Sequence, residues 1–308
     1  LKLGDSSEVI PSIKERLKIY HIKHLPDNSE AFDSTFLLAV KTFQKRMGLR
    51  VDGEIGPAFL REINTPIQQR IEQILINLER TRWLPKSANT DYILVNIPEY
   101  KLHYFEKGKK VFDMVVVVGS QAHSTVIFSG TINQIVFSPY WNVPSSILHN
   151  EILPGIRKNA NYLARHNMEW VGKRVRQKPG IRNSLGLVKF LFPNSYSIYF
   201  HDTPSKSLFN EPQRAFSHGC IRLAEPKKLA EYLLRRDPLW TEETISEAMN
   251  SGTEKYVRLS KKDEVPVYLV YFTSWVDSQG ELNFRKDIYG HDKKMAERLF
   301  QKTEKTAL

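Results

Sequence analysis

The feature that most constrains the fold is a change in the period of the apolar residues near Asp91. Before this point they recur every three to four residues, as on one face of a helix. After it they alternate, as in strands with one buried face. Because the two patterns occupy separate stretches, we predict an α+β protein: a small three-helix module followed by a mainly antiparallel, β-sandwich-like domain. The 308 residues suffice for two or three domains.

Residues 1–64 predict the helical module. Asp5 or Ser6 is expected to cap its first helix, and Asp33 or Ser34 its second. A longer helix then follows Thr65 and Pro66, with proline at its first position. We expect this helix to connect the domains across residues 65–90 and to pack through an apolar face made of Ile67, Ile71, Ile74, Leu75 and Leu78.

Residues 91–290 are predicted to form the sheet domain, with a C-terminal helix over 291–308. A hairpin is expected around residues 107–109, and another over 265–284. The strand pattern stops across residues 144–186, where two short helices are expected, followed by five basic residues with no acid between Val171 and Arg182. Such an insertion is typical of a lid or binding loop, although a basic run is also typical of a solvated loop tip.

The chain is basic, with 45 Lys and Arg against 34 Asp and Glu and a net charge of +11. This charge favours an anionic partner such as a cell-wall polymer or lipid headgroups, or it reflects scattered surface lysine. No nucleic-acid or phosphate-loop motif is present, so no nucleic-acid partner is predicted. No apolar run approaches the ~18 residues of a membrane span. Any membrane attachment is therefore expected to depend on sequence upstream of Leu1.

The single cysteine, Cys220, lies in the segment Ser217-His-Gly-Cys-Ile-Arg222, and His201 ends an expected strand upstream. A thiol attacks as a thiolate, so we expect the pKa of Cys220 to be lowered by a cation or by backbone dipoles. A histidine can supply both the base and the cation. Gly219 lets consecutive amides point at one place, as a tetrahedral oxyanion requires. Together these residues predict acyl transfer through a thioester.

Two other interpretations of Cys220 are considered. It could be a buried, inert thiol, since free cysteine is among the most buried residue types. It could also bind zinc together with His201 and His218. Ser-His-Gly-Cys is unusual for a core position, and no fourth zinc ligand is evident. The nucleophile is therefore favoured, and neither a metal nor a cofactor is predicted.

These motifs resemble the YkuD-type L,D-transpeptidases, and in particular their larger YcbB-like branch. The resemblance rests on the Cys220 segment preceded by His201, and on further stretches at residues 141–154, 201–209, 265–277 and 285–289. The first module resembles the three-helix peptidoglycan-binding domain through residues 43–56, which include the turn Asp52-Gly-Glu-Ile-Gly56. A helical bundle that packs on the next domain and binds nothing is the alternative for this module.

The resemblance implies an enzyme of the periplasm or cell envelope that cross-links peptidoglycan stem peptides. Cys220 would attack the third residue of a tetrapeptide stem and release the terminal D-alanine, and an amine of a second stem would then form a 3→3 cross-link. His201 would be the base, oriented by the main-chain carbonyl of Asp202. The amides of His218, Gly219 and Cys220 would form the oxyanion hole. Carbapenems would be covalent inhibitors.

The remaining site residues are predicted to meet the substrate. Arg222 would hold the catalytic loop or bind a stem carboxylate. Tyr199 and Trp141 are candidate walls of the substrate groove, or else core residues. The carboxylate of Asp202 could add a further contact. The insertion over residues 144–186 resembles the capping subdomain of the YcbB-like branch.

Other functions remain open at this stage. Water could replace the acceptor amine, which would make the chain an L,D-carboxypeptidase. A catalytically inactive cell-wall-binding protein is the non-enzymatic alternative, although the intact His201 and Cys220 argue against it. In papain-like proteases the cysteine precedes the histidine, whereas here the order is reversed.

Overall fold

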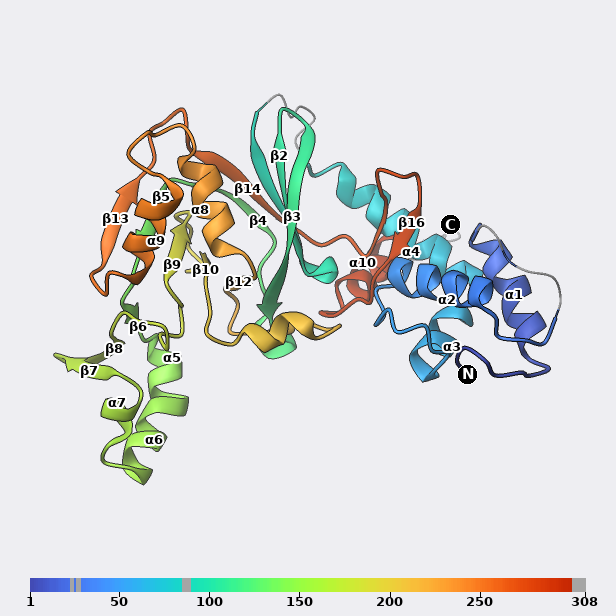
Figure 1. The fold of residues 1–308 in the computed structure, drawn as a ribbon, viewed down its shortest axis with the longest axis horizontal. Helices are drawn as coiled ribbons and strands as arrows, with labels where there is room; N and C mark the ends of the chain where they lie inside the picture. Colours follow the sequence, from blue (N-terminus) through green and yellow to red (C-terminus); the bar gives the residue numbers. More distant parts are fainter. Residues whose placement is uncertain (23–24, 26–28, 85–89, 301–308) are drawn as a thin grey trace, which may run out of the picture. The chain divides into compact units, whose positions relative to one another are not determined.

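The computed structural model describes residues 1–300 except 23–24, 26–28 and 85–89 (Figure 1). The chain divides into two compact units: residues 1–86 together with 271–308, and residues 87–270. The first unit is mainly helical and the second contains the large sheet, so the predicted α+β class is confirmed. Among the described residues, no helix is both long enough and apolar enough to cross a bilayer.

The first unit is built around a bundle of three short helices with a shared aromatic core. Phe36, Phe43 and Phe59 are buried there, and the rings of Phe43 and Phe59 lie 4.8 Å apart. A longer helix, a two-stranded hairpin and a last helix complete the unit. Its elements are α1 (Ile10–Ile19), α2 (Ser34–Arg46), α3 (Pro57–Ile63), α4 (Ile67–Thr81), β15 (Ser274–Val276), β16 (Leu282–Phe284) and α10 (His291–Leu299).

The helix starts were predicted correctly for α2 but not for α1. Asp33 caps α2, because its carboxylate accepts a hydrogen bond from the Phe36 amide at 2.7 Å. Helix α1 begins at Ile10, and the prediction that Asp5 or Ser6 caps it is wrong. Ser6 instead forms an antiparallel bridge with Ala31, so this stretch is extended rather than helical.

Helix α4 buries a different set of side chains from the predicted one, although Ile74 packs against the core of the first unit as expected. Asn77 and Arg80 are buried, and the apolar residues Ile67, Ile71, Leu75 and Leu78 are exposed. The partners of the polar face come from the end of the chain. Thr273 exchanges hydrogen bonds with Asn77, and Asp292 pairs with Arg80 at 2.6 Å. Burial of these polar groups is possible because they are paired with one another.

The segment after residue 270 therefore belongs with the helices. Strand β14 (Val265–Val270) lies in the large sheet, whereas β15 and β16 form a separate hairpin in the first unit. The prediction of one hairpin over 265–284 is wrong for this reason. The division by contacts also differs from the expected boundary at residue 290.

The second unit contains an eleven-stranded sheet in the order β13-β5-β9-β10-β12-β3-β2-β1-β14-β4, with β11 paired to β3. Most pairs are antiparallel, but β1 with β14, β10 with β12, and β11 with β3 are parallel. The strands are β1 (Tyr92–Asn96), β2 (Lys101–Glu106), β3 (Lys109–Gly119), β4 (Phe128–Ile132), β5 (Gln134–Phe137), β9 (Val188–Leu191), β10 (Phe200–His201), β11 (Ala215–Ser217), β12 (Ile221–Leu223), β13 (Lys255–Arg258) and β14.

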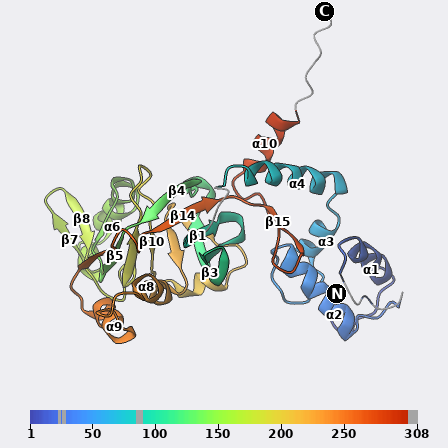
Figure 2. The same ribbon diagram turned by 90° about the horizontal axis from the view of Figure 1, so that it is seen from above.

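Two helices and three short helical turns accompany this sheet. Helices α8 (Pro226–Leu234) and α9 (Glu242–Asn250) lie close together beside it (Figure 2). Thr241 caps α9 with its side chain, as expected for a helix starting at this point. The turns are η1 (Ile97–Glu99), η2 (Gln121–His123) and η4 (Lys206–Asn210).

The insertion is a subdomain with its own small core, and it projects from the sheet in Figure 1. The prediction that strands stop between residues 144 and 186 is wrong, because β7 and β8 form a hairpin that pairs with β6. The core contains Ile147, Leu148, Ile152, Met168 and Val175. The elements are β6 (Trp141–Asn142), α5 (Ser145–Ile147), the π-helix η3 (Leu148–Ile152), α6 (Leu153–Lys158), α7 (Tyr162–Arg165), β7 (Met168–Val171) and β8 (Arg174–Gln177).

Candidate active site

The candidate active site is organised by the parallel pairing of two very short strands. In this register Phe200 of β10 pairs with Ile221 of β12, and His201 pairs with Arg222. Cys220 directly precedes β12, and therefore enters the sheet beside the strand that carries His201. Residues distant in sequence thus meet at one place, as the motif predicted.

The loop before Cys220 is held by hydrogen bonds from buried hydroxyls. Ser217 Oγ donates to the Cys220 carbonyl at 2.5 Å, and Thr125 Oγ1 donates to the Gly219 carbonyl at 2.8 Å. Both hydroxyl-bearing residues are buried. The sequence analysis quoted Ser217 only as part of the motif and did not find Thr125, which lies 94 residues from its partner. These contacts fix the position of the Cys220 backbone.

Gly219 makes a contact that the prediction did not include. Its amide donates to Ser217 Oγ at 3.1 Å and so is engaged within the loop rather than directed at a substrate oxyanion. Its φ is +109°, a backbone conformation that residues with a Cβ atom rarely adopt. Glycine is therefore required here by the turn that presents Cys220.

His201 is buried and held in one tautomer. Its Nδ1 donates to the main-chain carbonyl of Asp202 at 2.5 Å, the contact that the resemblance implied. Because a carbonyl only accepts, Nδ1 carries the proton and Nε2 has the free lone pair. Burial, with smaller effects of the Arg222 and Lys189 charges, lowers the pKa of His201 to about 3. At neutral pH the ring is therefore uncharged and able to act as a base.

The Cys220 thiol is partly buried and points toward the Ser197 carbonyl, 3.6 Å from its sulfur. Burial raises its pKa, although hydrogen bonds from the main chain and side chain of Tyr199 and the charge of Arg222 oppose this effect. The expectation of a lowered pKa is therefore wrong for this conformation. The site holds a neutral thiol and a neutral imidazole, so an attack by this sulfur would require its proton to leave in the same step.

Tyr199 and Arg222 lie close to the two reacting side chains. The ring of Tyr199 is 5.7 Å from that of His201, and burial together with the adjacent thiol raises the pKa of its hydroxyl. The Nε of Arg222 is buried and has no hydrogen-bond partner among the residues that the structure describes. A buried guanidinium N–H in this state is suited to an anionic ligand, since leaving it unpaired is costly.

Lys189 is a site residue that the sequence analysis missed. It lies on β9 directly opposite His201, on the other side from Arg222. Its ammonium donates to the Tyr140 carbonyl at 3.3 Å and lies 3.7 Å from the Glu254 carboxylate. Three basic side chains therefore form one row across β9, β10 and β12. The row is visible only from the strand pairing, because the three residues are far apart in the sequence and belong to no common motif.

The insertion contacts the catalytic loop through His218. The Nε2 of this exposed histidine is 3.0 Å from Glu151 in the π-helix η3, and its ring centroid is 4.8 Å from that of His123. The His218 side chain thus connects the insertion to the loop that precedes Cys220. Its predicted role was through the main chain, and this side-chain contact was not foreseen.

Two residues predicted to meet the substrate are engaged in the protein. Trp141 packs against the core of the insertion. The carboxylate of Asp202 accepts the Leu187 amide at 2.9 Å and pairs with Lys206 at 2.5 Å. Both placements favour structural contacts over substrate contacts.

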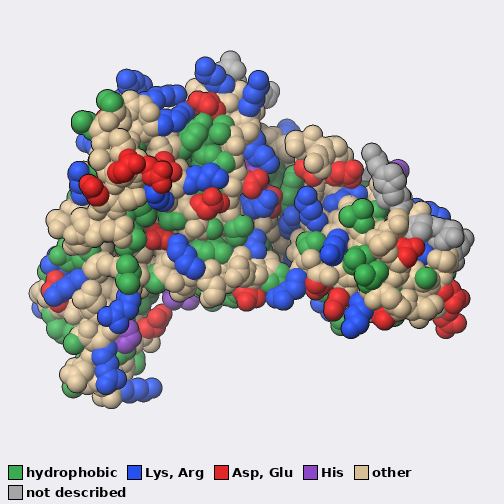
Figure 3. All heavy atoms as spheres, viewed as in Figure 1, with side chains coloured by type: hydrophobic (Ala, Val, Ile, Leu, Met, Phe, Trp, Pro, Cys, Tyr) green, Lys and Arg blue, Asp and Glu red, His purple; other side chains and the backbone are tan. Residues whose placement is uncertain are grey.

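The basic run of the insertion is partly neutralised. Glu169 on β7 pairs with Arg176 at 2.7 Å and with Lys178 at 3.1 Å, whereas Lys173 and Arg174 are exposed at the hairpin turn. Glu169 lies just before residues 171–182, the stretch that contains no acid. The pairing of β7 with β8 places it opposite Arg176. In Figure 3, Lys and Arg side chains are interspersed with Asp and Glu over the face in view.

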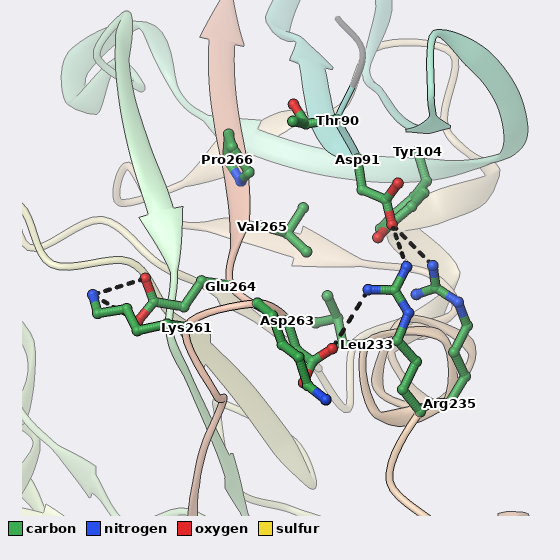
Figure 4. A pocket seen from close by; sticks show the side chains of 12 residues that line it. Thr90, Asp91, Tyr104, Leu233, Arg235, Lys261, Asp263, Glu264, Val265 and Pro266 are labelled. Atoms are coloured by element: carbon green, nitrogen blue, oxygen red, sulfur yellow. Dashed lines mark hydrogen bonds and ion pairs between the residues drawn. The ribbon is translucent and has the colours of Figure 1, made fainter.

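A separate pocket of about 360 Å³ lies at the other end of β3 from Cys220. Figure 4 shows Arg235 facing Asp91 there, with Tyr104 beside them, and the two charges are 2.9 Å apart. Strand β3 passes from Phe112, which pairs with Tyr104 of this pocket, to Gly119 near the catalytic loop, about 23 Å along the strand. The pocket is thus lined by paired charges and is remote from the thiol. Across the described residues, no group of three His, Cys, Asp or Glu is arranged to hold a metal.

Comparisons with known proteins match two parts of the chain to known families. Residues 90–265 match the family described as "L,D-transpeptidase catalytic domain", and residues 6–63 match the "Putative peptidoglycan binding domain". A Haemophilus influenzae protein named "Putative L,D-transpeptidase" is 32% identical over 245 residues, which are 73% of this chain and 49% of that protein. The chain thus spans about half the length of this curated relative.

Solved structures of L,D-transpeptidases are more distant. One from Stackebrandtia nassauensis is 18% identical and covers 75% of this chain and 88% of its own, with a TM-score of 0.33. One from Mycobacterium smegmatis is 12% identical and covers 58% of each chain, with a TM-score of 0.33. The catalytic-domain match spans more than half of the 308 residues and includes both His201 and Cys220, and the chain therefore belongs to the L,D-transpeptidase family.

Proposed function

We propose that the chain is a peptidoglycan L,D-transpeptidase with Cys220 as its nucleophile and His201 as its base. The observation that carries this proposal is the pairing of β10 with β12, which sets a neutral, single-tautomer histidine beside the strand that follows the only cysteine. Family membership supports the same reaction class.

In the acylation step, the Cys220 sulfur attacks the carbonyl of the third residue of a tetrapeptide stem. Nε2 of His201 takes the thiol proton as the carbon–sulfur bond forms. The bond to the terminal D-alanine then breaks, and the imidazolium gives the proton to the leaving amine. The products are free D-alanine and a thioester on Cys220.

In the second step, an amine of the third residue of another stem attacks the thioester. His201 takes a proton from this amine, and the 3→3 amide forms as the carbon–sulfur bond breaks. The departing sulfur regains the proton. Hydrogen bonds from Tyr199 lower the pKa of the thiol, so they stabilise the sulfur anion as it leaves.

Other residues are assigned supporting roles. The resemblance implies the main-chain amides of His218, Gly219 and Cys220 as oxyanion donors. Because the Gly219 amide already donates to Ser217 Oγ, we assign this role to His218 and Cys220. The buried, unpaired Nε of Arg222 favours a role in binding a stem carboxylate. Carbapenems are proposed to acylate Cys220, and the match of residues 6–63 supports peptidoglycan binding by the first module. The periplasm or cell envelope is the proposed location, since this polymer lies there.

Two alternatives are tested by the same experiment. Water in place of the acceptor amine would make a carboxypeptidase, and an inactive domain would leave a wall-binding protein. The chain is incubated with disaccharide-tetrapeptide fragments, and the masses of the products are measured by mass spectrometry. Cross-linked dimers with loss of one D-alanine support the proposal, whereas tripeptide alone indicates hydrolysis.

The matched control is Cys220→Ser, which nearly preserves side-chain size. It should form no product and take up no carbapenem mass while keeping the wild-type melting temperature. Wild-type turnover by this variant would overturn the nucleophile assignment.

A further inference from the structure

We propose that the side chain of Asp202 is an anchor: its carboxylate fixes the peptide whose carbonyl orients His201 and ties that peptide to the point where the insertion returns to the sheet. The inference deepens the proposed function and rests on its assignment of His201 as the base. It differs from the substrate-contact role that the sequence suggested for Asp202. Four contacts of this one residue carry it.

The carboxylate of Asp202 is buried and fully engaged. One oxygen accepts the Leu187 amide at 2.9 Å, and the other pairs with the Lys206 ammonium at 2.5 Å. The residue is only 5% exposed, so these partners compensate a charge that would otherwise be costly to bury. With both oxygens used inside the protein, the side chain has a fixed position.

The main chain of Asp202 makes the other two contacts, with His201 and with Val188. Its carbonyl accepts Nδ1–H of His201 at 2.5 Å, and its amide donates to the Val188 carbonyl at 2.9 Å. The peptide that orients the imidazole is therefore attached to the same residue as the anchored carboxylate. A shift of the side chain would move the acceptor that selects the tautomer of His201.

Gly186, the last residue of the insertion, is shaped to fit this carboxylate. A Cβ built on Gly186 would lie 2.3 Å from the nearer Asp202 oxygen, and its φ is +62°. The close approach is what allows the following amide, that of Leu187, to reach the carboxylate. The end of the insertion and the catalytic base thus share one anchor.

Asp202 and Lys206 line an open pocket of about 490 Å³ together with residues 225–228 at the start of α8. Neither Cys220 nor His201 lines this pocket, so the pocket beside the ion pair is distinct from the site of the thiol. A positioning role is therefore favoured over a binding role.

The test uses two variants that disturb the anchor from opposite sides. Asp202→Asn keeps the shape but removes the charge that faces Lys206, and Gly186→Ala pushes a methyl group into the carboxylate. The matched control is Gly172→Ala at the insertion's hairpin turn, where φ is +60° and the added Cβ would meet nothing within 4 Å. It has the same backbone strain without the clash.

Two measurements are made on the full chain. The first is the imidazole N–H signal of His201 in a ¹H–¹⁵N spectrum, assigned by its loss in His201→Gln. The second is the rate of carbapenem acylation from pH 5 to 8, followed by intact mass. We expect Asp202→Asn and Gly186→Ala to shift or broaden the signal and to slow acylation by about 10–100-fold, with Gly172→Ala like the wild type.

A wild-type His201 signal and wild-type acylation in both anchor variants would overturn the proposal. If Gly186→Ala fails to fold, Lys206→Met, which removes only the ion pair, takes its place and should show the same change to a smaller degree. The imidazole signal does not depend on turnover. Failure of the proposed transpeptidase reaction would therefore leave this test readable.

Discussion

Lys189 and His201 face each other across neighbouring antiparallel strands, and their side chains lie on the same face of the sheet. Arg222 flanks His201 from the opposite strand. Both cations disfavour a second proton on the imidazole, in addition to the larger effect of burial. The row therefore helps to keep the proposed base uncharged.

The first prediction concerns the charge of Lys189. Lys189→Met keeps the side-chain length and removes the cation, so the pKa of His201 should rise toward its ordinary value. The acid limb of carbapenem acylation should then move to higher pH, with less than about a twofold change in rate at pH 8. Lys110→Met, at an exposed position, is the control. An unmoved acid limb would show that Lys189 has no electrostatic effect on the base.

The second prediction concerns stability and pH. The folded state lowers the pKa of His201 from 6.5 to about 3, so the unfolded chain binds the proton first as the pH falls. This contribution to stability is complete above pH 6.5 and is lost progressively toward pH 3. Between pH 7 and 5, the free energy of unfolding of the wild type should fall by up to about 2 kcal/mol more than that of His201→Gln. Parallel pH dependences in urea titrations would contradict this.

The third prediction concerns the contact between Glu151 and His218. Both side chains are about half exposed, so the pair should contribute less than about 1 kcal/mol to global stability. Its effect should be local, because it connects η3 to the catalytic loop. Glu151→Gln should accelerate amide hydrogen exchange within Leu148–Ile152 and leave the melting temperature nearly unchanged. If amide exchange within Leu148–Ile152 is equal in Glu151→Gln and in the distant control Glu247→Gln, the contact does not stabilise η3.

The parts that the sequence predicted are those set by local patterns. Asp33 caps α2 because its side chain reaches an amide three residues on. The β2–β3 hairpin follows from alternating residues on both sides of a short turn. The proposed nucleophile and base were predicted from the sequence because Cys220 is unique and lies in a compact motif.

The rest depends on contacts between distant residues. The buried face of α4 is polar because Thr273 and Asp292 supply partners about 200 residues away, and no periodicity reveals such partners. The pKa of Cys220 depends on burial, which the motif does not encode. The row from Lys189 to Arg222 depends on the pairing of three strands, two of which have two or three residues only.

The last prediction concerns the basic turn of the insertion. Lys173 and Arg174 are exposed, and peptidoglycan stems end in carboxylates, so these charges should attract the donor. Lys173→Ser with Arg174→Ser should raise the KM for tetrapeptide fragments about 3–10-fold at low salt, and the difference should vanish as salt screens it. Glu169→Gln removes the acid paired with Arg176 and Lys178, and should act in the opposite direction.

Carbapenem acylation provides the internal reference for this experiment, because a small inhibitor needs little help from distant charges. Its rate should be the same in all these variants. Opposite shifts of the donor KM that both disappear at high salt would identify the insertion as an electrostatic guide. If instead all variants process fragments at wild-type efficiency at every salt concentration, the basic residues are solvated surface charges. The assignment of Cys220 and His201 would be unaffected, since neither touches this hairpin turn.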